Sequence, residues 1–159
     1  MRSLALVFLL LALAPPAFAG PPLSLTGVWE GMYSCKIQDE EGNRSLKVPA
    51  TLLINQLGPS GPLEVVFLSK GSGGYSGTIV QSDVKPNEGV GALISCGTSD
   101  ATTAFLYNEI ETFSYKLAAD GGGTLKMNGS RVTNSSEVSA CKTTWTRTAT
   151  KAPITVPCP

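Results

Sequence analysis

The sequence predicts an all-β protein: an antiparallel closed barrel, or a sandwich, of eight or nine short strands. Short runs rich in β-branched and aromatic residues alternate with clusters of Gly, Pro, Asn, Asp and Ser, a pattern typical of strands joined by turns. Apolar residues rarely follow a helical period. The chain is also long enough for one domain with a core of its own.

The first 19 residues have the features of an export signal. Arg2 gives a positive start, Leu4–Ala14 form an apolar run, and Ala17-Phe18-Ala19 ends in a small-x-small cleavage pattern. The apolar run is shorter than the roughly 20 residues that a membrane-spanning helix needs. We therefore expect residues 1–19 to be removed and the protein to be periplasmic or extracellular, with no membrane span.

Residues 20–150 are expected to form the single barrel domain, with 151–159 as an irregular Pro-rich tail pinned by Cys158. The predicted strands are 26–37, 48–57, 63–69, 75–82, 89–96, 102–107, 110–118, 124–132 and 138–148. Turn residues at 58–62, 71–74 and 120–123 separate several of them. Residues 99–111 could instead hold a short helix capped by Ser99 or Asp100.

Charge gives no support to a nucleic-acid or membrane-surface partner. The chain has 12 basic and 12 acidic residues, and removal of residues 1–19 takes away one basic residue. There is no basic run and little interleaving of aromatic residues with Lys or Arg. We expect a monomer whose partner is a small ligand or an envelope or extracellular protein.

Four cysteines in an exported chain indicate two disulfides, for which three connectivities are possible. A metal site is disfavoured because the sequence has no histidine and no Cys-x-x-Cys motif. No cofactor is expected.

The first and last predicted strands suggest how the barrel closes. Side chains alternate between the two faces of a strand, so an antiparallel pairing with Cys35 opposite Cys141 also opposes Gly31 to Trp145. Trp145 would cover the bare backbone of Gly31. Cys96 is then left to pair with Cys158.

The same register opposes Trp29 to Arg147, whose guanidinium would stack on the indole ring. Trp29, Tyr33 and Trp145 could alternatively line a ligand pocket, but the seam already gives them a structural role.

Gly27-Val28-Trp29 in the first strand, with Arg147 near the end of the last, resembles the lipocalin and avidin (calycin) pattern. The residues WEGMYSC and CKTTWTR also resemble the two ends of small secreted bacterial domains of unknown function. Those have W-x-G-x-Y-x-C near the start and C-x-x-aromatic-x-x-R near the end, and this chain has one more residue between Cys141 and Trp145. The resemblance implies a barrel and carries over no ligand.

Few residues offer catalytic chemistry. Without histidine, the Ser-His-Asp and Cys-His nucleophile systems are absent. The best carboxylate pair is Glu109 and Glu111, on the same strand face as Tyr115. If that face points inward, these residues would line a cavity at the barrel mouth; the favoured interpretation is that both carboxylates lie at a strand end and are solvated.

Two loop features are interpreted structurally. Residues 39–43 contain oxygen ligands but lack the spacing of a calcium loop, so a solvated hairpin is favoured. Asn43, Asn128 and Asn134 would be glycosylation acceptors only in a eukaryotic host.

The sequence thus favours an exported, non-enzymatic binding or interaction module whose ligand occupies the barrel mouth. One alternative is a protease or lysozyme inhibitor, which would present residues 38–47 or 83–88 as a long loop. The other is a hydrolase that uses Glu109 and Glu111.

Overall fold

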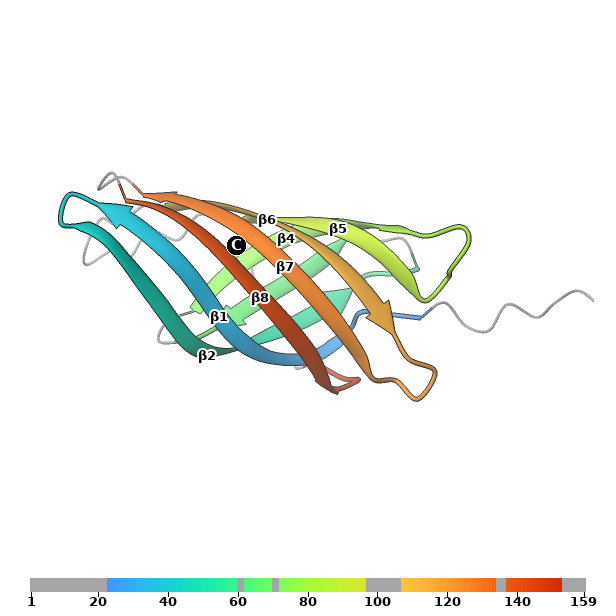
Figure 1. The fold of residues 1–159 in the computed structure, drawn as a ribbon. Coiled ribbons are helices and arrows are strands. Elements are labelled where there is room, and N and C mark those ends of the chain that lie inside the picture. Colours follow the sequence, from blue (N-terminus) through green and yellow to red (C-terminus); the bar gives the residue numbers. More distant parts are fainter. Residues whose placement is uncertain (1–22, 60–61, 70–71, 97–106, 134–136, 153–159) are drawn as a thin grey trace, which may run out of the picture.

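The computed structural model describes residues 23–59, 62–69, 72–96, 107–133 and 137–152. They form a closed barrel in which each strand pairs antiparallel with the next and the first pairs with the last (Figure 1). The strands are β1 (Gly27–Asp39), β2 (Gly42–Gln56), β3 (Leu63–Leu68), β4 (Ser72–Gln81), β5 (Glu88–Ser95), β6 (Tyr107–Leu117), β7 (Gly123–Thr133) and β8 (Val138–Ala149).

The predicted closed antiparallel barrel is confirmed, and the sandwich alternative is not. The described residues contain eight strands. The predicted ninth strand at 102–107, and the helix considered for 99–111, fall largely outside the described residues, as do the signal segment and residues 153–159. Within the described ranges, no helix is long and apolar enough to cross a membrane.

The seam between β1 and β8 has the predicted register. Cys35 lies opposite Cys141 and Gly31 lies opposite Trp145. The two cysteines form a disulfide inside the barrel, with their Cα atoms 4.0 Å apart. The seam is therefore fixed by a covalent bond as well as by the hydrogen-bonded ladder.

Gly31 is required at its position because the β8 backbone and the Trp145 ring both lie close to it. A Cβ atom built on Gly31 would lie 2.6 Å from the carbonyl oxygen of Thr144 and 3.1 Å from the Trp145 ring. Trp145 is fully buried. A bare backbone at residue 31 thus makes room for the largest side chain of β8.

At the closed end of the barrel, Trp29 is enclosed from two sides. Its indole Nε1 donates a hydrogen bond to the carbonyl oxygen of Leu25, 3.0 Å away, and the Arg147 guanidinium lies 5.5 Å from its ring centroid. Leu25 itself is fully buried. The segment before β1 therefore packs across this end of the barrel.

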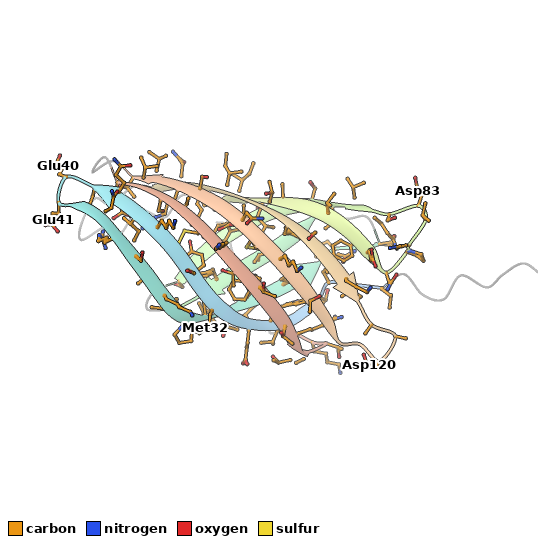
Figure 2. All side chains as sticks on the ribbon, in the orientation of Figure 1. Met32, Glu40, Glu41, Asp83 and Asp120 are labelled. Atoms are coloured by element: carbon orange, nitrogen blue, oxygen red, sulfur yellow. A yellow bond between two sulfur atoms is a disulfide. The ribbon has the colours of Figure 1, made fainter. Side chains whose placement is uncertain are left out.

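The opposite end, here called the mouth, is marked by the β1–β2 turn. Figure 2 shows Glu40 and Glu41 at the tip of this turn, with Asp83 and Asp120 in loops at the closed end. At the mouth the barrel wall is uneven, because β2 pairs with β3 only over Thr51–Gln56. Among the described strands, Gly42–Ala50 pair with β1 alone.

Only one of the two predicted disulfides, Cys35–Cys141, is found among the described residues. Cys158 lies outside them, so its pairing with Cys96 stays a prediction.

We expect Gly31→Ala to lower the free energy of unfolding by about 1–3 kcal/mol, since the new methyl group must displace Trp145 or the β8 backbone. Gly122→Ala, in the half-buried turn before β7, is the control. The nearest atom to its Cβ would be the Asp120 carboxylate oxygen, at 3.1 Å, and no backbone atom lies among the contacts. Urea unfolding measures both variants, and equal stabilities would contradict the proposed fit between Gly31 and Trp145.

The double substitution Cys35→Ala and Cys141→Ala is expected to lower stability by about 4–5 kcal/mol, because the disulfide closes a loop with a sequence separation of 106 residues. Urea unfolding of the wild type and the double variant tests this. Peptide mapping of the unreduced wild type should find Cys35 joined to Cys141, and a Cys35–Cys96 peptide would overturn the register.

Candidate functional site

The mouth contains a cavity of about 250 Å³. Its walls are mainly apolar and aromatic, and a carboxylate and a guanidinium supply its charged groups. The lining residues are Tyr33, Leu46, Val48, Phe67, Ser69, Ser72, Gly73, Tyr75, Glu109 and Arg131. Apolar walls with a few converging polar groups are typical of small-molecule sites.

Glu109 is the buried carboxylate of this cavity. It is 3% exposed, and its two oxygens accept hydrogen bonds from the hydroxyl groups of Tyr33 (2.7 Å) and Tyr75 (2.6 Å). Its backbone N–H donates to the Ser95 hydroxyl at 2.9 Å. The carboxylate of this β6 residue therefore receives donors from β1 and β4, which offset part of the penalty for burying it, while β5 fixes its backbone.

Glu111 lies beside Glu109, deeper in the barrel, and is also 3% exposed. Its carboxyl group fills the space over Gly129, where a Cβ atom would lie 2.1–2.2 Å from the carboxyl atoms. Burial, the charge of Glu109 and a hydrogen bond with Glu109 raise the pKa of Glu111 to about 9. At neutral pH the Glu111 carboxyl group is therefore protonated.

The tyrosine that donates from β1 is held in its neutral form. Burial first, and then the nearby charge of Glu109, raise the pKa of Tyr33 well above its usual value. The Tyr33 hydroxyl thus remains a hydrogen-bond donor across the physiological pH range.

Arg131 faces Glu109 directly across the β6–β7 ladder. The Nη2 atom of Arg131 lies 2.6 Å from one carboxylate oxygen of Glu137. The other oxygen of Glu137 lies 2.7 Å from Nη2 of Arg44. The Nε atom of Arg44 also lies 2.8 Å from Asp39. These ion pairs link the β1–β2 turn to the start of β8 and form a charged rim along one side of the mouth.

The structure corrects the expectation that Glu109 and Glu111 are solvated. Both point inward and are almost fully buried. The physical reason is that β6 begins at Tyr107, so Glu109 is not at the exposed strand end. Gly129 provides space for one carboxyl group, and Tyr33 and Tyr75 provide donors to the other.

Three other residues that the sequence analysis singled out, Tyr115, Trp29 and Trp145, do not line the mouth cavity. Tyr115 is buried over Gly89 nearer the closed end and does not line the mouth cavity. Trp29 and Trp145 are fully buried in the core. Trp145 contacts Phe67, a cavity wall, with ring centroids 6.1 Å apart. Tyr33 belongs to both the seam strand and the cavity.

Sequence reasoning missed Arg131, Glu137, Phe67 and Tyr75 as site residues. The alternation Leu125, Met127, Gly129, Arg131 on β7 carries a signal for an inward arginine. No comparable signal exists for Phe67 and Tyr75, because the pairing that brings β3 and β4 to Glu109 depends on the closed barrel.

The two loop candidates are shorter than the inhibitor hypothesis requires. Residues 38–47 form a tight turn between long strands, with β1 ending at Asp39 and β2 starting at Gly42. The segment 82–87 is a compact turn, in which the Glu88 backbone N–H donates to the carbonyl of Lys85 at 2.9 Å. The predicted hairpin at 39–43 is confirmed, and the Asp39 carboxylate there pairs with Arg44.

Within the part of the chain that the structure describes, no group of three or more His, Cys, Asp or Glu side chains is placed to hold a metal ion. The polar groups that line the cavity are the Glu109 carboxylate, the hydroxyl groups of Tyr33, Tyr75, Ser69 and Ser72, and the ion-paired Arg131 guanidinium.

Comparison of the chain with protein-family models, with curated proteins and with solved structures finds no match.

Stability is expected to fall as pH rises, because the folded state holds the Glu111 proton up to a pKa of about 9 and the unfolded chain releases it near 4.5. The stabilisation is complete below pH 4.5 and decreases by about 1.4 kcal/mol per pH unit until it is lost near pH 9. Urea unfolding at pH 5.5 and pH 8 measures this loss. Glu111→Gln should remove most of it.

The control for this prediction is Glu30→Gln on the exposed outer face of β1, which should keep the wild-type slope. The pKa values of Asp39 and Glu88 are lowered by Arg44 and Lys116 respectively, so these two groups contribute only in more acidic solution. If Glu111→Gln lost stability between pH 5.5 and pH 8 as steeply as the wild type does, Glu111 would not be the group that holds the proton.

Proposed function

We propose that this protein is an exported, non-enzymatic binding module that takes a small, largely apolar ligand into the cavity at the barrel mouth. The observation that carries the proposal is the cavity itself, about 250 Å³ in volume, at the end of the barrel opposite the buried Trp29. A buried disulfide among the described residues is consistent with an oxidising compartment outside the cytoplasm.

The cavity wall suits an apolar ligand body. Leu46 and Val48 come from the part of β2 that pairs only with β1 among the described strands, and Phe67 comes from the end of β3. Burial of apolar ligand surface against such side chains contributes roughly 25 cal/mol per Å² before the costs of association. Polar groups lie at one side, where they can orient a ligand head group.

The hydrolase that uses Glu109 and Glu111 is the second candidate. In its favour, the two carboxyl groups are paired and one holds a proton, as an acid–base pair requires. Against it, Glu109 lines the cavity and Glu111 does not, and both Glu109 oxygens already accept tyrosine hydrogen bonds. This arrangement favours recognition by Glu109 over bond cleavage by the pair.

The inhibitor hypothesis has less support. Neither 38–47 nor 83–88 forms the long exposed loop that such an inhibitor would present to an enzyme cleft.

Cavity blocking tests the proposed function. N-phenyl-1-naphthylamine, an uncharged dye that fluoresces in apolar surroundings, is titrated into the wild type and into Val48→Trp, whose indole would occupy the cavity. We expect the wild type to bind the dye and Val48→Trp to bind it at least tenfold more weakly.

Val80→Trp is the matched control, because Val80 is 68% exposed on the outside of β4 and does not line the cavity. It should bind the dye like the wild type. Circular dichroism melts of all three proteins check that they are folded. No binding by the wild type, or equal binding by Val48→Trp, would overturn the proposal.

A further inference from the structure

We propose that the mouth cavity selects ligands that carry a cationic amine on an apolar body, and that the Glu109 carboxylate receives the amine. This inference rests on the proposed function and specifies the ligand class of the same site. Its basis is the combination of an inward carboxylate, three aromatic side chains and the balance of charges around the mouth.

The aromatic side chains form the first part of the argument. Tyr33, Phe67 and Tyr75 line the cavity. Tyr33 and Phe67 contact each other edge to face, with centroids 4.9 Å apart, and the hydroxyl groups of Tyr33 and Tyr75 both point to Glu109. An ammonium group at Glu109 would therefore lie beside two phenol oxygens, each of which can accept a hydrogen bond while donating its own.

The charge balance is the second part. The two rim arginines, Arg44 and Arg131, are matched by two carboxylates, Asp39 and Glu137, in direct ion pairs of 2.6–2.8 Å. Among the described residues Glu109 makes no direct ion pair of this kind, although Arg131 lies opposite it across the β6–β7 ladder and its charge interacts with that of Glu109. The neighbouring Glu111 carboxyl group is protonated at neutral pH, so it does not compete with Glu109 for a cation.

Arg131 is the group that could reverse this selectivity, because it also lines the cavity and could receive an anion. Glu137 lies 2.6 Å from it and is 9% exposed, so the guanidinium is already neutralised by a buried carboxylate. An anionic ligand would have to compete with Glu137 and would approach Glu109 as well. Lys36 and Lys47, on the same side of the barrel, are exposed and outside the cavity lining.

Three probes with the same body separate the head groups: 3-phenylpropylamine, 3-phenyl-1-propanol and 3-phenylpropanoate. Each is used to displace N-phenyl-1-naphthylamine from the wild type at pH 7, and calorimetric titration gives the affinities. We expect the amine to bind at least tenfold more tightly than the alcohol, and the propanoate to bind most weakly. Added salt should weaken the amine more than the alcohol.

Two nearly isosteric variants locate the selectivity. Glu109→Gln should reduce amine affinity about tenfold and leave alcohol affinity unchanged, since the amide keeps the shape but removes the charge. Glu111→Gln should keep the amine preference, since the Glu111 carboxyl group is already uncharged. The double variant should treat amine and alcohol alike, which excludes ionisation of Glu111 as a substitute for Glu109.

The outcomes distinguish the two proposals. Failure of the dye to bind the wild type would overturn the binding function itself. Dye binding with equal affinity for amine and alcohol, or a preference for the propanoate, would overturn the amine selectivity and leave the cavity as a site for neutral or anionic ligands. Loss of amine preference in Glu111→Gln but not in Glu109→Gln would contradict the assigned role of Glu109.

Discussion

The pairing of β1 with β8 is the constraint on which the rest of the structure depends. It turns an eight-stranded meander into a barrel, and so gives the sheet an inside. Closure places β1 next to β8, with only β8 and β7 between β1 and β6 on that side of the barrel. Tyr33 of β1 can then reach Glu109 of β6 through the barrel interior. The Cys35–Cys141 disulfide and the Gly31–Trp145 contact hold this pairing in one register. A slip of one residue would turn the inward side chains of β1 to solvent.

The barrel interior divides into two regions with different physical requirements. Near the closed end, Trp29, Leu25 and Leu125 are fully buried, and apolar contact provides the stabilisation. Near the mouth, carboxyl groups replace apolar side chains, and each must be compensated by hydrogen bonds or by a proton. Glu109 receives two phenol hydroxyl groups and Glu111 retains its proton. These two forms of compensation explain how the barrel holds two carboxyl groups that are each 3% exposed.

Much of the fold could be predicted from local signals in the sequence. Strand alternation and turn residues located most of the strands, and the opposed cysteines, tryptophans and arginine of the two end strands gave their pairing. Alternation placed Glu109 and Glu111 on the same strand face as Tyr115, but it did not decide that this face points inward, and the expectation that both are solvated was wrong. Their burial depends on Gly129, Tyr33 and Tyr75, which lie 18, 76 and 34 residues away and become neighbours only when the barrel closes. The pattern of residues along one strand does not report which distant side chains will donate hydrogen bonds to a carboxylate or leave space for it.

The one-sided pairing of β2 has a consequence for the wall of the mouth cavity. Gly42–Ala50 hydrogen-bond to β1 alone among the described strands, so Leu46 and Val48 lie on a strand that is paired on one side only, while β1 beside it is also paired with β8. Outward movement of this part of β2 breaks no hydrogen bond between β1 and β8 and costs less free energy than global unfolding. The Arg44–Glu137 ion pair links it to the residue before β8. The side of the cavity lined by Leu46 and Val48 is therefore held by backbone hydrogen bonds on one edge only among the described strands.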